Sequence, residues 1–372
     1  MQVELLCKQH HTINGLARYA RSLTAAYDQM GLRYRVAAPQ TPPILRPAVA
    51  FGRKLGLDVS TFLQTFPLSA DFESHTSIKH LTSQEMATWL TTRRSQQPIV
   101  VTVHDILPHL LQDQGELAEL HHPVERRFYR RAMRGLTLAD HLVADSDYTK
   151  RSLIKALGIR SSKISVVPLA IDHTLFRPVE LAANFFEQFE LQPHHPIVLY
   201  VGSDAPRKNL GRLLAAFQHV HQSHPEAIFI KVGSFTNQAQ ADKLRAQIAS
   251  LGLTSAVRVV NNVSAENLVN FYNAASVFVF PSLYEGFGLP PLEAMACGAP
   301  VACSNSSSLP EVVGDAALLF DPTNIEMMRD AIEQLLTNAT LATKMRQRGL
   351  QQAQRFRWCK TAEQTAAVYQ ML

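Results

Sequence analysis

Residues 281–298 read Pro-Ser-Leu-Tyr-Glu-Gly-Phe-Gly-Leu-Pro-Pro-Leu-Glu-Ala-Met-Ala-Cys-Gly, and they follow the apolar run 277–280. The apolar run predicts a strand. The paired prolines predict the first position of a helix that ends before Gly298, because a missing N–H costs nothing there. Gly286 and Gly288 let the intervening backbone approach a ligand closely. The unpaired N–H groups of the first helical turn, with the positive end of the helix dipole, predict a site for anionic oxygens.

Two carboxylates flank this anion site, Glu285 before the helix and Glu293 inside its first turns. Carboxylates accept hydrogen bonds from hydroxyl groups, so the stretch suggests a ligand that is part phosphate and part sugar or ribose. Such a ligand is a nucleotide sugar. Glu293 has a structural alternative, because the helix dipole favours a carboxylate near the start of a helix whatever its function. Glu285 lies outside the helix and has no such alternative.

The stretch resembles the Glu-x7-Glu motif of the large retaining glycosyltransferase family 4, which has the GT-B fold; here the motif runs from Glu285 to Glu293. The resemblance implies an α/β protein with two Rossmann-like parallel-sheet domains facing a central cleft. It also implies a C-terminal helix that crosses back to the first domain. We therefore expect an acceptor-binding domain over 1–172 together with a helix over 356–372, and a donor-binding domain over 173–355.

The resemblance also implies roles for single residues. Glu285 would contact a hydroxyl of the donor sugar, and Glu293 would accept hydrogen bonds from the ribose. Further donor contacts are implied for Gly286, Phe287, Gly288 and Leu289 at the sugar and phosphate, and for Asn262 and Val263 beside the nucleobase. Gly15 would face the donor diphosphate, although Ala17 replaces the second glycine that family members often carry. The alternative is that Gly15 serves only a turn.

The run 99–103 is almost entirely β-branched, as expected for a strand buried on both faces of a parallel sheet. His104 follows it directly. Ligands of open α/β sheets bind beyond the carboxyl ends of the strands, so His104 is a candidate functional residue. The family resemblance implies that it contacts the donor sugar near the anomeric centre. Most of the 15 histidines are expected to be ordinary surface or core residues.

Arg207 and Lys208 are adjacent in a predicted loop after the strand 197–201. Breaking a sugar–phosphate bond leaves negative charge on the departing diphosphate, which Arg can hold as a fork and Lys as a point charge. Such pairs are common on protein surfaces, but this one matches the family's Arg-Lys-Asn-Leu segment. Because no Asp-x-Asp motif occurs in a suitable loop, we expect catalysis without a metal ion or other cofactor.

Bulk properties describe an ordinary globular protein. A chain of 372 residues exceeds the size of one hydrophobic core, so two domains are expected. No apolar run approaches the roughly 18 residues of a membrane span, and the N-terminus reads as a strand. The four cysteines show no paired spacing. A cytoplasmic protein is expected, with a peripheral place on the inner face of the membrane as a further alternative.

The first half of the chain is the basic half. Residues 1–172 hold 21 Lys and Arg against 15 Asp and Glu, while the remainder holds 15 against 16. A predicted helix over 116–136 carries Arg126, Arg127, Arg130, Arg131 and Arg134. These arginines either form a solvated helix face or bind electrostatically to an anionic membrane that holds a lipid-linked acceptor. Nucleic-acid binding is not expected, because no recognised nucleic-acid-binding motif occurs in this segment.

Together these features predict a retaining hexosyltransferase of polysaccharide or lipopolysaccharide synthesis, with a glycan or lipid-linked acceptor. The segment 102–108, Thr-Val-His-Asp-Ile-Leu-Pro, resembles bacterial mannosyltransferases, which favours GDP-mannose as donor over UDP-glucose or another UDP-hexose. Two alternatives remain. One is a GT-B epimerase or nucleotide-sugar hydrolase, which needs no acceptor. The other is a non-catalytic sugar-binding or assembly protein, expected to have lost Glu285, Arg207 or Lys208.

Overall fold

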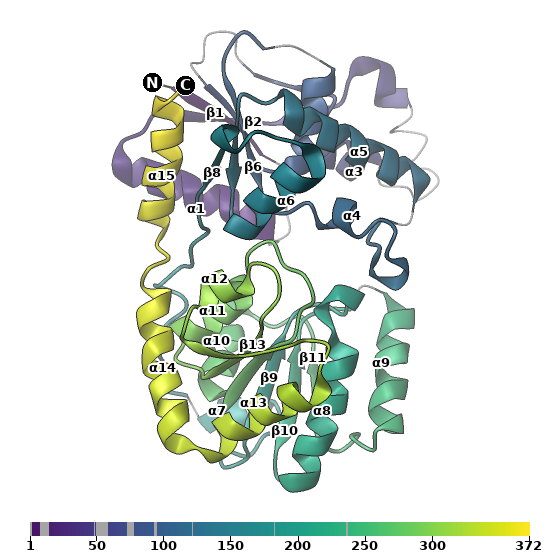
Figure 1. The fold of residues 1–372 in the computed structure, drawn as a ribbon, viewed down its shortest axis with the longest axis vertical. Coiled ribbons are helices and arrows are strands. Elements are labelled where there is room, and N and C mark those ends of the chain that lie inside the picture. The colour runs from purple at the N-terminus through teal and green to yellow at the C-terminus, as the bar shows by residue number, and fades with distance from the viewer. Residues whose placement is uncertain are drawn as a thin grey trace. The chain divides into compact units, whose positions relative to one another are not determined.

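The computed structural model describes residues 2–7, 15–47, 49, 59–72, 78–92, 95–120, 122–181, 183–235 and 237–372. The chain forms two compact units (Figure 1). The first comprises Met1–Leu169 and Trp358–Leu372, and the second comprises Ala170–Arg357. The sequence placed these boundaries at 172 and 355. The last helix, α15 (Trp358–Gln370), belongs to the first unit although the second unit precedes it in the chain.

The sheet of the first unit has six parallel strands. In spatial order these are β2 (Tyr34–Ala37), β1 (Val3–Leu6), β5 (Ile78–Leu81), β6 (Ile99–Val103), β7 (His141–Ala144) and β8 (Ile164–Val166). β6 is buried at all five positions, as its β-branched sequence predicted. Because the strands are parallel, the residues that follow β5, β6 and β7 all lie at one edge of the sheet.

Helices and short strands surround this sheet. The helices are α1 (Gly15–Met30), α3 (Val59–Thr65), α4 (Leu107–Leu110), α5 (Pro123–Leu138), α6 (Asp147–Leu157) and α15. Four 3-10 turns are η1 (Pro43–Leu45), η2 (Gln84–Thr91), η3 (Gly115–Leu117) and η4 (Ser161–Lys163), and β3 (Pro39–Gln40) pairs with β4 (Ser69–Ala70) in an antiparallel ladder. Ser146 caps α6 by accepting a hydrogen bond from the Thr149 N–H, and Gly158 ends the helix with a φ of 66°.

The expected helix over 116–136 was wrong at its start. The segment contains η3, a non-helical stretch and then α5, which begins at Pro123. Proline disfavours helical backbone in the residue before it but suits a first helical position, so the helix cannot extend further back. The segment after β5 forms η2, a 3-10 helix. Residues 41–75 received no prediction; they include η1, α3 and β4, whereas 48, 50–58 and 73–75 lie outside the described residues.

A buried chain of hydrogen bonds ties α15 to the sheet. Tyr369 Oη lies 2.8 Å from the hydroxyl of Tyr27 in α1 and 2.5 Å from Nδ1 of His80 in β5. The other ring nitrogen of His80 lies 2.7 Å from Oγ1 of Thr102, which is also 3.0 Å from the hydroxyl of Tyr19. Burial lowers the pKa of His80 to about 3, so the ring is neutral and one nitrogen donates while the other accepts. α15 therefore packs beside α1 as part of the first unit (Figure 1).

The second unit repeats the pattern with another sheet of six parallel strands. In spatial order these are β11 (Val257–Val260), β10 (Ile228–Val232), β9 (Ile197–Val201), β12 (Val277–Phe280), β13 (Val301–Ser304) and β14 (Ala317–Phe320). The helices are α7 (Ala183–Gln188), α8 (Leu210–Ser223), α9 (Gln238–Ser250), α10 (Ala265–Ala274), α11 (Leu289–Ala296), α12 (Leu309–Val313), α13 (Ile325–Thr337) and α14 (Ala339–Ala353), with the 3-10 turn η5 (Pro206–Lys208). The chain builds β10 and β11 on one side of β9 and then places β12 on the other side. The strand order thus reverses between β9 and β12.

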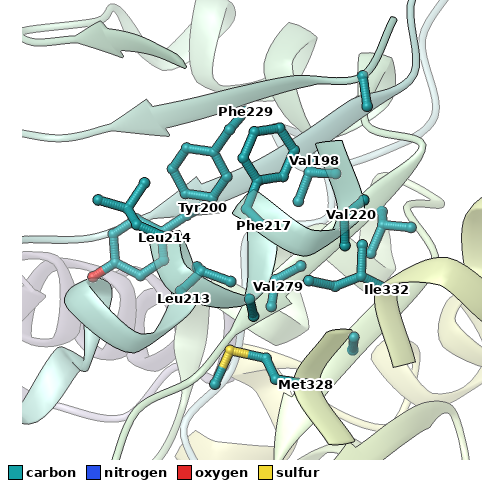
Figure 2. Packing of buried hydrophobic residues seen from close by; sticks show 14 of the residues in the cluster. Val198, Tyr200, Leu213, Leu214, Phe217, Val220, Phe229, Val279, Met328 and Ile332 are labelled. Atoms are coloured by element: carbon teal, nitrogen blue, oxygen red, sulfur yellow. The ribbon is translucent and has the colours of Figure 1, made fainter. Parts of the chain in front are cut away.

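The core of the second unit fixes β9 against α8. Strand residues two apart, Val198 and Tyr200, point to the same face of the sheet and meet Phe217 of α8 (Figure 2). Further cluster members shown in the figure are Leu213, Leu214, Val220, Phe229, Val279, Met328 and Ile332. All of these residues are almost fully buried, so large-to-small changes here are expected to cost about 2–5 kcal/mol each. This packing holds the loop between β9 and α8, which carries Arg207 and Lys208.

Candidate active site

Three loops meet where the strand order of the second sheet reverses. They follow β9, β12 and β13, whose carboxyl ends share one edge of the sheet. Such a switch point is the usual ligand site of open α/β sheets. The loop after β9 carries η5, and the loop after β12 carries Glu285 and leads into α11.

Glu285 forms ion pairs with both predicted cations. Its Oε1 accepts a hydrogen bond of 2.6 Å from Nζ of Lys208, and its Oε2 accepts one of 3.1 Å from Nη1 of Arg207. All three side chains are largely buried, with exposed fractions of 11%, 12% and 19% for Glu285, Lys208 and Arg207. Burial alone would raise the pKa of Glu285, but the charges of Lys208 and Arg207 outweigh it and hold the pKa below its ordinary value. The cluster is therefore ionised and carries one net positive charge.

Backbone and amide contacts join the two loops that carry these charges. The Leu283 N–H donates to the carbonyl of Arg207 at 2.8 Å. Asn209 is 5% exposed, and its amide donates to the carbonyls of Pro281 at 3.1 Å and Pro322 at 2.7 Å. Asn209 adopts a φ of 60°, which Asn tolerates better than most residues. Sequence reasoning assigned no role to Asn209, although it belongs to the quoted Arg-Lys-Asn-Leu segment.

α11 begins at Leu289, one residue before the position expected from the prolines. Pro290 occupies the second position, where the N–H is also unpaired within a helix, so the same physical reason still applies. Gly288 precedes the helix with a φ of 124°, and a Cβ there would lie 2.7 Å from Cδ2 of Leu309. This position therefore requires glycine. Gly298 adopts a φ of 81° after the last turn, as predicted.

Two serines hold the glycine loop. Ser308 Oγ donates to the carbonyls of Glu285 at 2.9 Å and Phe287 at 2.6 Å, and Ser307 Oγ accepts from the Glu285 N–H at 2.9 Å. The sequence did not single out either serine, although the serine-rich run 304–308 was a visible signal. With these contacts the residues 285–288 have a fixed backbone conformation.

Glu293 points into the second unit. Its Oε2 accepts a hydrogen bond of 2.9 Å from the hydroxyl of Tyr272 in α10, and the residue is 4% exposed. The contact gives Glu293 a structural role other than the expected one, because Glu293 lies beyond the first turn of α11, where a helix dipole favours carboxylates. Ribose binding by Glu293 stays a prediction.

His104 lies in the first unit, directly after β6 as predicted. Its Nδ1 lies 2.6 Å from Oδ2 of Asp145, which follows β7, and its Nε2 lies 3.0 Å from the carbonyl oxygen of Thr82, which follows β5. The Nε2–H donates to the Thr82 carbonyl, and Nδ1 shares a proton with the Asp145 carboxyl group. Burial alone would lower the pKa of His104, but the charge and hydrogen bond of Asp145 raise it overall. The sequence missed Asp145 and Thr82, and sugar contact by His104 stays a prediction.

Replacing Asp145 with asparagine is expected to lower the pKa of His104, because the carboxylate that favours the imidazolium form is lost while burial remains. The titration of the His104 ring by NMR checks this, with Asp147→Asn as control because Asp147 is exposed two residues further on. A His104 pKa that is the same in Asp145→Asn and in wild type would show that Asp145 does not control the charge.

The remaining predicted residues do not belong to the ion cluster. Gly15 is the first residue of α1, and residues 8–14 before it lie outside the described residues. Asn262 and Val263 follow β11, the edge strand, two strands away from β9. Ser234 Oγ lies 3.2 Å from Oδ1 of Asn262, so the loops after β10 and β11 are in contact. The nucleobase role of these two residues and the diphosphate role of Gly15 stay predictions.

Within the described ranges, no group of three or more His, Cys, Asp and Glu side chains could hold a metal ion. None of the helices in these ranges is both long enough and apolar enough to cross a membrane.

Comparison with known proteins assigns the family. Residues 13–175 match Glycosyltransferase Family 4, and residues 182–352 match Glycosyl transferases group 1. The chain belongs to glycosyltransferase family 4. This family 4 chain is 32% identical over 278 residues to O-antigen chain mannosyltransferase B of Escherichia coli, which covers 73% of this chain and 70% of that protein. It is 30% identical over 270 residues to the serotype-specific mannosyltransferase WbdA of Escherichia coli, covering 71% of this chain and 32% of that protein.

Solved structures confirm the predicted GT-B class. Sucrose-phosphate synthase from Thermosynechococcus elongatus matches with a TM-score of 0.76 at 22% identity, covering 100% of this chain and 98% of that one. Anabaena HepE in complex with UDP-glucose matches with a TM-score of 0.74 at 18% identity, covering 100% of both chains. The family 4 chain is thus a glycosyltransferase built from two Rossmann-like units.

Proposed function

We propose that this glycosyltransferase transfers mannose from GDP-mannose to a glycan or lipid-linked acceptor during the synthesis of a cell-surface polysaccharide such as lipopolysaccharide. The observation that carries the proposal is the cluster of Arg207, Lys208 and Glu285 beside the N-terminus of α11. The names of the relatives, an O-antigen chain mannosyltransferase and a serotype-specific mannosyltransferase, support mannose as the sugar. A UDP-hexose is the alternative donor.

In the proposed reaction, the bond between the anomeric carbon and the diphosphate oxygen breaks while the acceptor hydroxyl bonds to the same carbon. The leaving phosphate takes the proton of the acceptor hydroxyl, so the acceptor attacks from the face that the diphosphate leaves and the configuration is retained. Lys208 and Arg207 hold the charge that develops on the diphosphate, and the first-turn N–H groups of α11 add donors. Glu285 orients both cations through its ion pairs. In the same place, its carboxylate accepts a hydrogen bond from a hydroxyl group of the sugar. No metal ion is required in this scheme.

The experiment that tests the donor is a thermal-shift screen of the whole chain with GDP-mannose, UDP-glucose and free GDP and UDP, each with and without EDTA. A donor present at 100 times its Kd stabilises the folded protein by about 2.7 kcal/mol. We expect the largest shift with GDP-mannose and no loss with EDTA. A thermal shift with UDP-glucose alone would change the proposed donor but not the proposed transferase activity. Turnover of the donor without an acceptor would favour the hydrolase or epimerase alternative. Loss of binding in EDTA would contradict metal independence.

Location in the cytoplasm and peripheral contact with an anionic membrane are part of the same proposal. They are supported by the basic face of α5, where Arg127, Arg130 and Arg134 are exposed. A basic residue near an anionic surface contributes about 1 kcal/mol to membrane binding.

A further inference from the structure

The first unit contains a cavity of about 1110 Å³, and the α5 arginines of the proposed membrane contact belong to its lining. It is bounded by the end of η2, the start of β6 and one face of α5. Its lining includes Ile99, the first residue of β6, and Asp140, which directly precedes β7. The cavity therefore lies at the amino-terminal edge of the sheet. His104 and Asp145 follow the other ends of the same strands, about 16 Å away at roughly 3.3 Å per strand residue.

Four arginines of α5 line this cavity: Arg127, Arg130, Arg131 and Arg134. Their spacing of three, four and seven residues places them on one face of the helix. The rest of the helix is packed inside the unit: Ala132 and Met133 are buried, and α5 lies against η2. The arginines are thus held together by a helix whose position is fixed by packing.

Within the described part of the chain, none of the four guanidinium groups forms an ion pair with another residue. Among the described lining residues Asp140 carries the single carboxylate, and its Oδ2 already accepts the Ile99 N–H at 2.8 Å. Arg131 Nε donates to Oγ1 of Thr91 in the cavity wall. Like charges at this helical spacing repel one another, so a bound anion would relieve the repulsion as well as fill the cavity.

The other lining residues narrow the class of anion. The hydroxyl groups of Thr91 and Thr92 already donate to the carbonyls of Thr88 and Trp89, so the arginines are the main donors of the cavity. Leu90, Ile99 and Leu138 offer apolar surface. Arginine forks match the geometry of phosphate oxygens. We infer that this arginine cavity, formed by α5, η2 and the start of β6, binds a phosphate-bearing ligand separate from the nucleotide sugar. The chemistry fits the phosphate of an anionic lipid headgroup and that of a soluble phosphate compound, and it does not depend on which donor the enzyme uses.

The test compares two double variants of the whole chain. Arg130→Ala/Arg134→Ala removes two exposed arginines from the cavity, and Arg151→Ala/Arg160→Ala removes the same charge from exposed positions of the same unit outside it. Isothermal titration with pyrophosphate is expected to show binding to wild type and to the control variant. The same binding should be at least about 10-fold weaker in the cavity variant. Pyrophosphate bound by Arg207 and Lys208 is common to all three proteins and cancels in the comparison.

A second variant guards against an unspecific loss of charge. Leu138→Glu keeps every arginine and places a carboxylate at a position that is 55% exposed, so the variant should fold and still bind pyrophosphate more weakly in the cavity.

Cosedimentation with phosphatidylcholine vesicles, with or without phosphatidylglycerol, distinguishes a lipid headgroup from a soluble phosphate compound. A lipid headgroup is the ligand if the cavity variant loses binding to the phosphatidylglycerol vesicles and the control keeps it. Pyrophosphate binding without vesicle binding assigns a soluble phosphate compound. Equal binding of both probes by the cavity variant and the control, or no binding by wild type, overturns the inference.

Discussion

Replacing Lys208 with alanine is expected to lower kcat by about 100-fold or more while the protein remains folded. The loss follows from the scale of transition-state charge stabilisation, where removing one donor costs about 10²–10³ in turnover. Lys208 Nζ lies 2.6 Å from Glu285 in a site where the exposed fractions are 12% and 11%, so water screens the charge poorly. Arg207 remains 3.1 Å from Glu285 in the variant and keeps the carboxylate paired.

Initial rates of sugar transfer with the donor identified by the thermal-shift screen measure this effect. Because the interaction strengthens as the diphosphate leaves, kcat and kcat/KM should fall together, whereas loss of ground-state binding alone would raise KM. Lys243→Ala is the matched control, since Lys243 is exposed on α9 of the same unit. A Lys208→Ala enzyme with the kcat of wild type would remove Lys208 from the diphosphate site and with it the central part of the proposed mechanism.

The grouping of Arg207, Lys208 and Glu285 could be predicted because two sequence features determine it. Apolar runs 197–201 and 277–280 identify strands, and functional side chains of parallel sheets gather beyond the carboxyl ends. What the sequence could not supply is the spatial order of the strands. Only the adjacency of β9 and β12 brings residues 77 and 78 positions apart into one ion cluster.

The hydrogen-bond partners of single side chains could not be predicted either, because they also depend on which strands and helices are neighbours. Asp145 reaches His104 because β6 and β7 are neighbours, and Tyr272 reaches Glu293 because α10 lies against α11. Each of these pairs changes the interpretation of the predicted residue. Asp145 raises the pKa of His104 despite its burial, and Glu293 has a hydrogen-bond donor before any ribose arrives.

The arginines of α5 show the difference between composition and shape. Their helical spacing was visible in the sequence, and it predicted a basic face. The cavity required two further segments, η2 and the start of β6, which approach α5 only in the folded first unit. That approach depends on a single glycine, because an ideal Cβ on Gly135 would lie 1.9 Å from the carbonyl oxygen of Ala87 in η2.

Gly135→Ala is therefore expected to destabilise the first unit by about 3 kcal/mol or more, at the upper end of the usual cost of overpacking, because the obstacle is backbone and cannot rotate away. The intrinsic helix preference of alanine over glycine, about 1 kcal/mol, would predict the opposite sign. Gly211→Ala is the matched control: Gly211 also lies in a helix, α8, but its new Cβ would meet only the flexible side chain of Gln247 at 3.2 Å. Urea unfolding followed by far-UV circular dichroism reports both units and therefore both variants. The two tryptophans, Trp89 and Trp358, both belong to the first unit, so their fluorescence assigns the effect of Gly135→Ala to that unit. A midpoint that falls in Gly135→Ala and not in Gly211→Ala would show that backbone contact between α5 and η2 positions the arginine cavity, whereas an unchanged or raised midpoint in Gly135→Ala would mean that helix preference outweighs the contact.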